Sequence, residues 1–198
     1  MDASGASEKG LHLANQDGFL IDLKRGLFAV ADGVSTSRHG GEASAKAIAV
    51  LSQEFAGDLE AAFQSAHAQV RKLDGTTTLT AAHVHGSILD VAHVGDSALF
   101  LIAGKVTRIT DSDTAEGSNV ITQVIGGRSI MPHLYRLHAR PGDTILLATD
   151  GVANYLTSRE IAKAAAGQVA DAPAALLAVA RKKTKLYEDD KTVVVVRV

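Results

Sequence analysis

The chain has 198 residues, of which 46% are hydrophobic and 21% are charged. This length and composition are typical of one globular domain with a substantial core, and they exclude an intrinsically disordered chain. The formal net charge is −2 and no long basic run is present, so we expect neither nucleic acid nor a membrane surface as a partner. Cysteine is absent, which excludes disulfides, thiolate zinc sites and cysteine nucleophiles.

Targeting signals are not evident in the sequence. The first residues, Met1 to Gly5, lack the basic and then apolar pattern of a signal peptide. No apolar run reaches the roughly 18 residues that a membrane-spanning helix needs. We therefore expect a cytoplasmic protein that forms a single domain over residues 1–198.

The first part of the chain predicts a hairpin followed by two helices. Short β-type runs at 18–23 and 26–31 are separated by a polar pair, as in a β-hairpin. Apolar residues recur at helical spacing over 42–55 and again, after a break, up to Leu73. Asp58 is a suitable N-cap for the second of these helices, because its carboxylate can accept a hydrogen bond from a free backbone N–H.

A region rich in β-branched residues follows and predicts six further strands. The runs lie at residues 76–84, 87–94, 98–102, 105–109, 133–137 and 144–149. Glycine-containing pairs between the first four runs, including Gly95-Asp96, predict tight antiparallel turns.

The last part of the chain predicts two helices and a closing strand. Thr157 and Glu160 form a capping box that opens one helix, and Asp171 with Pro173 opens the next. The apolar run after Lys191 predicts a strand buried on both faces. We therefore expect an α+β fold in which helices cover two packed sheets.

Five aspartates share one context, because each lies at an end of a β-type run beside a glycine or another turn-forming residue. They are Asp17, Asp32, Asp96, Asp150 and Asp189. Each alone has a simple interpretation as a turn residue, since Asp-Gly and Gly-Asp pairs are common in turns. Asp32 and Asp150, however, directly follow apolar strands, where an unpaired buried carboxylate is costly.

If these strand ends converge, the carboxylates crowd together. Two anions about 4 Å apart repel by roughly 4 kcal/mol at an effective dielectric constant near 20, so protons or cations must relieve the repulsion. Oxygen ligands without cysteine favour Mg²⁺ or Mn²⁺ over zinc. Two such ions, about 3.5–4 Å apart, could share a bridging water and clamp a phosphoryl group for in-line attack. The Gly-x-Ser-x-Gly and Walker motifs of other enzymes are absent.

Six short motifs occur in one order from about residue 10 onward, and together they resemble the motif series of the metal-dependent protein phosphatases of the protein phosphatase 2C type. The motifs are Asn15-Gln16-Asp17, Val30-Ala31-Asp32-Gly33, Gly75-Thr76-Thr77, His93-Val94-Gly95-Asp96-Ser97, Leu147-Ala148-Thr149-Asp150-Gly151 and Asp189-Asp190-Lys191-Thr192-Val193. The resemblance implies a four-layer α-β-β-α sandwich of two mostly antiparallel sheets flanked by helix pairs. It also implies a serine/threonine protein phosphatase that hydrolyses phosphoserine and phosphothreonine by direct attack of a metal-bridging water.

The resemblance implies a role for each aspartate at two Mn²⁺ or Mg²⁺ ions. Asp32 would bridge both ions, and the Gly33 carbonyl would join one of them. Asp150 and Asp189 would hold the first ion. Asp17 would hold the second ion through water.

The resemblance also concerns two further residues, one at a third ion and one at the substrate phosphate. Asp96, with Asp150 shared, would match a third, weaker metal site. Where the family usually has a phosphate-binding arginine, three residues before Asn15, this chain has His12. A histidine can still donate a hydrogen bond to phosphate, although it lacks the bidentate fork of arginine.

Histidines also suggest a separate metal hypothesis. His83 and His85 alternate on a predicted strand and would share a face, and His93 follows nearby. No third ligand stands at zinc spacing in the sequence, so hydrogen-bonded or solvent-facing histidines are the simpler interpretation.

Three functions stay open at this point. The first is an active phosphatase on phosphorylated proteins, with a cognate serine/threonine kinase as a further partner and a monomeric state. The second is a catalytically weak pseudophosphatase that binds a phosphoprotein or kinase as a regulator, although a binding module has no need of crowded carboxylates. The third is a hydrolase of small phosphoesters.

Overall fold

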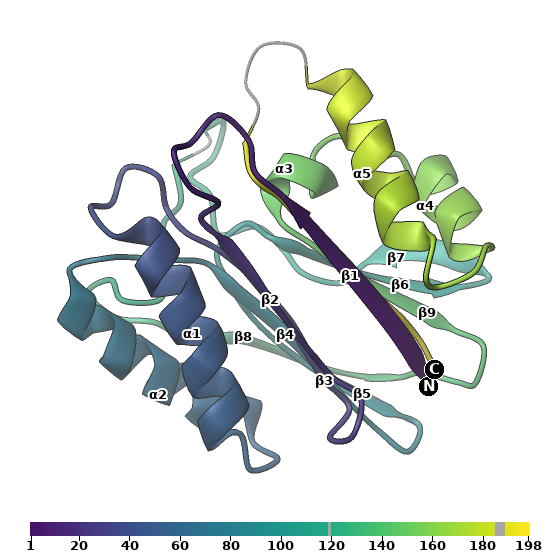
Figure 1. The fold of residues 1–198 in the computed structure, drawn as a ribbon. Coiled ribbons are helices and arrows are strands. Elements are labelled where there is room, and N and C mark those ends of the chain that lie inside the picture. The colour runs from purple at the N-terminus through teal and green to yellow at the C-terminus, as the bar shows by residue number, and fades with distance from the viewer. Residues whose placement is uncertain (119, 185–188) are drawn as a thin grey trace.

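The computed structural model describes residues 1–118, 120–184 and 189–198. Within them, two antiparallel sheets pack face to face (Figure 1). The first sheet contains, in spatial order, β1 (Asp2–Glu8), β10 (Lys191–Arg197), β9 (Thr144–Ala148), β6 (Ala98–Ala103) and β7 (Lys105–Arg108). The second contains β2 (Asp17–Asp22), β3 (Leu27–Asp32), β4 (Leu79–His85), β5 (Ile88–Val94) and β8 (His133–His138).

Helices cover the outer side of each sheet (Figure 1). The second sheet carries α1 (Gly40–Glu54), α2 (Leu59–Val70) and the 3₁₀ turn η1 (Arg71–Leu73). The first sheet carries α3 (Asp150–Ala153), α4 (Ser158–Ala165) and α5 (Ala172–Lys183). The predicted α+β fold and its four-layer α-β-β-α sandwich are confirmed.

Local signals in the sequence explain where the helices begin. The Asp58 side chain accepts a hydrogen bond from the backbone N–H of Ala61 at the start of α2. At α4, Thr157 and Glu160 form the predicted capping box. Each cap satisfies backbone N–H groups that have no partner within the helix, so the predicted starts of both helices are confirmed.

Three hydrophobic layers hold the sandwich together, one at each interface between neighbouring layers. Phe63 and Leu79 pack between the α1–α2 pair and the second sheet. Phe28 and Leu147 pack between the two sheets, and Leu176 packs between α5 and the first sheet. Each fully buried side chain of this size contributes roughly 1.5–3 kcal/mol. These interfaces therefore fix the positions of the strand ends.

The closing strand β10 has the central position that its apolar sequence predicts. It lies between β1 and β9, and it is buried from Lys191 to Val196. Strand β1, which pairs with it in full register from Asp2 to Glu8, was not predicted. Its sequence of small and polar residues shows no alternation of apolar and polar side chains, so its extended form depends on pairing with β10.

The prediction of a tight antiparallel turn at Gly95-Asp96 is wrong. Strands β5 and β6 lie in different sheets, so this segment carries the chain across the sandwich. Gly95 has a φ of +113°, and a Cβ at this position would collide with the side chain of Thr78. Only glycine fits such a conformation and such a close approach.

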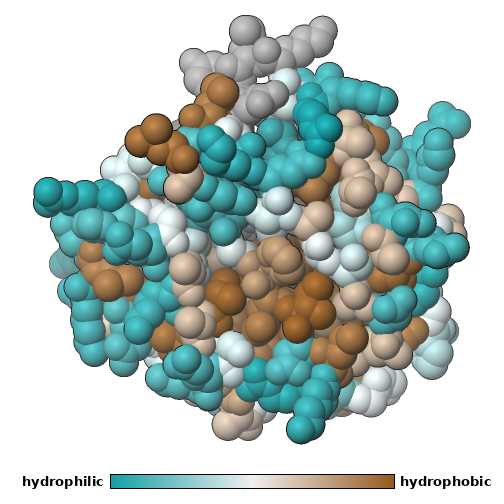
Figure 2. All heavy atoms as spheres, viewed as in Figure 1, coloured by the Kyte–Doolittle hydropathy of each residue, from teal (hydrophilic) through white to brown (hydrophobic). Residues whose placement is uncertain are grey.

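The edge strands β1 and β2 lie side by side at the front of the view in Figure 1, and Figure 2 shows apolar side chains gathered over them. Phe19 of β2 is 38% exposed, and its ring lies against Gly5 of β1. The apolar area on this face is therefore the seam where the edges of the two sheets meet. Among the described residues, no helix is long and apolar enough to cross a lipid bilayer.

Candidate metal centre

The structure brings the five aspartates together at one end of the sandwich. Asp17 at the start of β2 lies directly opposite Asp32 at the end of β3. Asp150 follows β9, and Asp189 precedes the neighbouring strand β10. Asp96 lies in the segment that crosses between the sheets. Burial, and then the negative charge of the other four aspartates, raises the pKa of Asp32, so all five lie close enough to interact electrostatically.

Two threonines position Asp32. Its backbone N–H donates to Oγ1 of Thr78 at 3.0 Å, and Oγ1 of Thr77 donates to its carbonyl oxygen at 2.8 Å. Oγ1 of Thr78 also lies 3.0 Å from Oγ of Ser97, the residue after Asp96. These hydrogen bonds join the end of β3 to the crossing segment and fix the backbone that carries two of the aspartates.

Thr149 connects the two sheets at Asp17. Its hydroxyl donates to Oδ2 of Asp17 at 2.9 Å and accepts from the backbone N–H of Thr192 at 3.0 Å. Sequence reasoning treated Thr149 only as the neighbour of Asp150. The position of the threonine directly before the aspartate is the one signal in the sequence that could have identified it.

Burial and mutual repulsion make these carboxyl groups poor acids. Burial is the largest cause that raises the pKa of Asp17 to about 7 and the pKa of Asp96 to about 7. Burial, followed by the charges of the neighbouring aspartates, raises the pKa of Asp32 well above its ordinary value. Burial and the charge of Asp189 raise the pKa of Asp150. Without a bound cation, these groups therefore retain protons close to neutral pH.

Three carboxylate oxygens in this cluster are buried and accept no hydrogen bond from any described residue. They are Oδ1 of Asp17, Oδ1 of Asp96 and Oδ1 of Asp150. Buried polar atoms without a partner are uncommon and costly. A set of anionic oxygens that lacks donors fits a hard divalent cation such as Mg²⁺ or Mn²⁺.

Within the described ranges, no three of these carboxylates bring one oxygen each within 4.8 Å of one another. Side chains would therefore have to move for three of them to coordinate one ion.

His12 lies beside this cluster. Its Nδ1 atom is 3.2 Å from Oδ2 of Asp190 and 3.9 Å from Oδ1 of Asp189. Asp190 is buried and also accepts hydrogen bonds from the backbone N–H groups of Gly10, at 2.6 Å, and Gln16, at 2.7 Å. Sequence reasoning assigned no role to Asp190, which fixes the loop that carries His12.

Gly33 directly follows Asp32 at a point where the chain is too crowded for a side chain. Its N–H donates to the carbonyl oxygen of Gln16 at 3.1 Å. A Cβ on Gly33 would collide with the carbonyl oxygen of Gly40, the first residue of α1. Glycine is therefore required here for packing, and the role of its carbonyl as a metal ligand stays a prediction.

A cleft of about 380 Å³ opens beside the cluster, and Asp32 and Asp189 lie in its wall. The other lining residues are apolar or hydroxyl-bearing: Val34, Ser35, Thr36, Thr76, Thr78, Val120, Ile121 and Val124. None of these described lining residues is a lysine or an arginine. The charge of a phosphoryl group in this cleft would therefore be met mainly by bound cations.

Asp113 and His93 support the crossing segment and were not assigned a role from the sequence. Oδ2 of Asp113 accepts from the N–H of Gly95 at 2.8 Å, and its Oδ1 lies 2.7 Å from Nε2 of His133. The two ring nitrogens of His93 lie 2.8 Å from Oγ1 of Thr80 and 2.9 Å from the carbonyl oxygen of Gly95. Burial lowers the pKa of His93 to about 4. The interpretation of His93 as a hydrogen-bonded histidine is confirmed.

Comparisons with known proteins agree with this geometry. The sequence model of the family described as Protein phosphatase 2C matches residues 4–187. The serine/threonine protein phosphatase PstP of Mycobacterium tuberculosis is 32% identical over 193 aligned positions, which cover 80% of this chain and 37% of PstP. The chain thus spans little more than a third of the length of that relative.

Two solved structures share the fold over nearly their whole length. One is the catalytic domain of PstP in complex with two manganese ions, with 30% identity, a TM-score of 0.83 and coverage of 98% of this chain and 96% of that one. The other is the phosphatase MsPP of Mycobacterium smegmatis in complex with cacodylate, with 27% identity, a TM-score of 0.85 and coverage of 100% and 98%. This chain belongs to the protein phosphatase 2C family of metal-dependent protein phosphatases.

Proposed function

We propose that this chain is a metal-dependent serine/threonine protein phosphatase and that the aspartate cluster is its active centre. The observation that carries the proposal is the group of buried carboxylate oxygens without hydrogen-bond donors on Asp17, Asp96 and Asp150. They belong to the same cluster as Asp32 and Asp189, which line an open cleft. The family membership, and the two manganese ions in the related PstP catalytic domain, support it.

The proposed ligand roles follow the resemblance to the family. Asp32 would bridge two Mn²⁺ or Mg²⁺ ions, and the Gly33 carbonyl would join one of them. Asp150 and Asp189 would hold the first ion, and Asp17 would hold the second through water. When bound, two such ions supply positive charge to the phosphoryl oxygens and a water of lowered pKa for in-line attack.

Asp96 would contribute to a third, weaker site with Asp150. Its pKa is raised to about 7, first by burial and next by the charge of Asp150. Asp96 therefore keeps a proton more readily than an ordinary aspartate, as Asp17 and Asp32 also do. The hydrogen bonds of Asp113 to Gly95 hold the backbone next to Asp96 in place.

The remaining residues of the site would orient the substrate and exclude water. His12, held by Asp190, would donate a hydrogen bond to the phosphate from the rim of the cleft. Thr149 would keep Asp17 aimed at the second ion. Val34 and Val124 would contact the apolar part of the substrate next to the phosphorylated side chain.

The geometry favours an enzyme over a regulator that only binds phosphoproteins. Crowded buried carboxylates repel an anionic phosphate unless cations are present, so a site built only for phosphate binding would gain nothing from them. The further expectations of a monomer, a cytoplasmic location, a cognate kinase and no nucleic-acid partner stay predictions.

Hydrolysis of a phosphothreonine peptide by the purified chain tests the proposal. Phosphate release is expected with millimolar Mn²⁺ and not after chelation, and Asp150→Asn is expected to abolish it. A parallel assay with p-nitrophenyl phosphate compares the two enzyme classes: a protein phosphatase should have the higher kcat/KM on the phosphopeptide, and a hydrolase of small phosphoesters should not. Manganese binding in calorimetry without hydrolysis of either substrate would support the regulator instead.

A further inference from the structure

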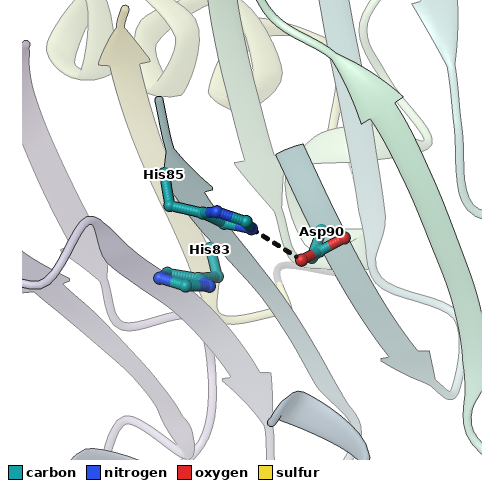
Figure 3. A group of neighbouring side chains, drawn as sticks. All are labelled: His83, His85 and Asp90. Atoms are coloured by element: carbon teal, nitrogen blue, oxygen red, sulfur yellow. Dashed lines mark hydrogen bonds and ion pairs between the residues drawn. The ribbon is translucent and has the colours of Figure 1, made fainter. Parts of the chain in front are cut away.

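A second group of metal-ligating side chains lies outside the aspartate cluster. His83 and His85 project from β4, and Asp90 projects from the neighbouring strand β5 (Figure 3). One ligand atom from each of these three residues lies within 4.8 Å of the other two. Strand register brings them together, because His83 is the direct cross-strand partner of Asp90.

This histidine cluster is remote from the aspartate cluster. His83 pairs with Leu27 at the far end of β3, and Asp32 lies at the other end of that strand. A separation of five residues in an extended strand corresponds to roughly 16 Å. The two groups therefore cannot share an ion.

The histidines are preorganised by packing. The rings of His83 and His85 are stacked, with centroids 4.6 Å apart and an interplanar angle of 23°. Phe55, at the end of α1, packs edge-on against His83 with centroids 4.8 Å apart. Nδ1 of His83 is buried and has no hydrogen-bond partner among the described residues. An unsatisfied imidazole nitrogen between fixed neighbours is a feature that a bound metal ion would explain.

Asp90 supplies a negative charge to this group. Nε2 of His85 lies 2.8 Å from Oδ2 of Asp90. Arg136 of β8 donates to Oδ1 of Asp90 at 2.6 Å and to Oδ2 at 3.0 Å. Arg136 can keep one oxygen of Asp90 in place while the other binds an ion, as partners of metal ligands commonly do.

The surroundings allow a cation to enter. Asp90 lies in the wall of a neighbouring cavity of about 500 Å³, which Asp58, Glu60 and Arg136 also line. His85 is 42% exposed at its side chain and Asp90 is 18% exposed. Three carboxylates and one guanidinium at this cavity give it a negative balance.

We propose that His83, His85 and Asp90 bind a zinc-type transition metal ion, distinct in place and in chemistry from the hard ions of the aspartate cluster. Two imidazoles and one carboxylate suit zinc, with a fourth position left to water. Zinc lies about 2.0–2.2 Å from such ligands. The side chains therefore need to rearrange to hold it, and the direct contact between Nε2 of His85 and Oδ2 of Asp90 has to open. Both rings bind as neutral imidazoles, and His85 turns a lone pair, not an N–H, toward the ion.

Zinc titration of the metal-free full chain by calorimetry tests this site, with saturating Mg²⁺ present to occupy the aspartate cluster. The wild-type chain is expected to bind one zinc ion more than His85→Asn, or to bind that ion at least tenfold more tightly. His83→Gln should show the same loss. His85→Asn alters an exposed side chain and so preserves the fold, which circular dichroism checks.

His138→Asn is the matched control, because His138 is an exposed histidine of the same sheet that lies outside the group of three. This variant is expected to retain the wild-type zinc stoichiometry and affinity. Zinc should also raise the unfolding temperature of the wild type more than that of His85→Asn. Equal zinc binding by wild type, His85→Asn and His83→Gln would overturn the proposal, and so would an equal loss in His138→Asn, which would indicate diffuse binding to surface histidines.

Discussion

The two ends of the second sheet carry two proposed ion-binding groups of different chemistry. At one end, aspartates from five separate segments meet at strand ends and offer only oxygen ligands. At the other end, three residues of one hairpin offer two imidazoles and a carboxylate. The type of ligand therefore distinguishes the ions that the two ends would bind, since groups of oxygen ligands favour Mg²⁺ or Mn²⁺ and imidazole favours zinc.

The two groups also balance charge differently. In the aspartate cluster no described lysine or arginine lines the cleft, and burial raises the pKa values of Asp17 and Asp96 to about 7. In the histidine cluster, Arg136 already neutralises Asp90 and lowers its pKa to about 2. The first group therefore depends on cations far more than the second does.

The substitution expected to have the largest effect at the aspartate end is Asp32→Asn. Loss of the central carboxylate removes the proposed bridge between two ions, and we expect turnover to fall about 1,000-fold or more, at the upper end of the effect of single charge-stabilising groups. The turnover number of Mn²⁺-dependent peptide hydrolysis measures it, with circular dichroism as a check on folding. His138→Asn serves as the control with unchanged turnover. Activity of Asp32→Asn equal to wild type at saturating manganese contradicts the assignment.

Manganese should stabilise the aspartate end in a pH-dependent way. Because the pKa values of Asp17 and Asp96 are raised, the metal-free folded state binds more protons than the unfolded state. The stability that these bound protons contribute is lost as the pH rises from about 4 through about 7. Protons compete with Mn²⁺ below pH 7. At 100 times the dissociation constant, binding adds about 2.7 kcal/mol, or roughly 5–10 °C for a chain of this size.

Thermal unfolding with Mn²⁺ and with chelator at pH 8 and pH 5.5 measures this effect. The difference in unfolding temperature between the two samples is expected to be larger at pH 8. A shift that is equal at both pH values, or larger at pH 5.5, would count against ion binding by these carboxylates.

Asp190→Asn tests whether Asp190 stabilises the loop that carries His12. An amide nitrogen in place of one carboxylate oxygen faces the N–H of Gly10 or Gln16 and leaves it without an acceptor. The free energy of unfolding is expected to fall by about 1–3 kcal/mol, as urea denaturation would show. An unchanged unfolding free energy would mean that the loop does not depend on Asp190.

His12→Ala is expected to have the smallest effect. Loss of one hydrogen bond to a charged phosphate costs about 1.5 kcal/mol or more, which corresponds to a rise of about tenfold in KM with a smaller change in kcat. His12→Arg, which restores the usual residue of the family, should recover or lower KM. If KM for the phosphopeptide does not change in His12→Ala, then His12 does not bind phosphate.

The aspartate end could be largely predicted from the sequence because each of its five aspartates lies at an end of a β-type run beside a turn-forming residue. The five aspartates chosen by this criterion do meet in the structure. The criterion gave no role to Asp190 and Thr149, because it ranks positions by strand ends and does not reveal hydrogen bonds to a distant loop or strand.

The histidine end could not be predicted, because its third ligand depends on strand register. His83 and His85 were expected to share a face, but Asp90 comes opposite His83 only through the pairing of β4 with β5. The path of the chain at Gly95-Asp96 could not be predicted for the same reason. The sequence indicates that the chain changes direction there, but it does not indicate that the chain passes from one sheet to the other. Long-range pairing decides both features.

Anomalous X-ray diffraction from crystals grown with Mn²⁺ tests the central claim most directly. Data collected at the manganese absorption edge should show two peaks among Asp17, Asp32, Asp150 and Asp189, and no manganese peak at His83, His85 and Asp90. Absence of manganese from the aspartate cluster, or manganese bound only at the histidine cluster, would contradict the account.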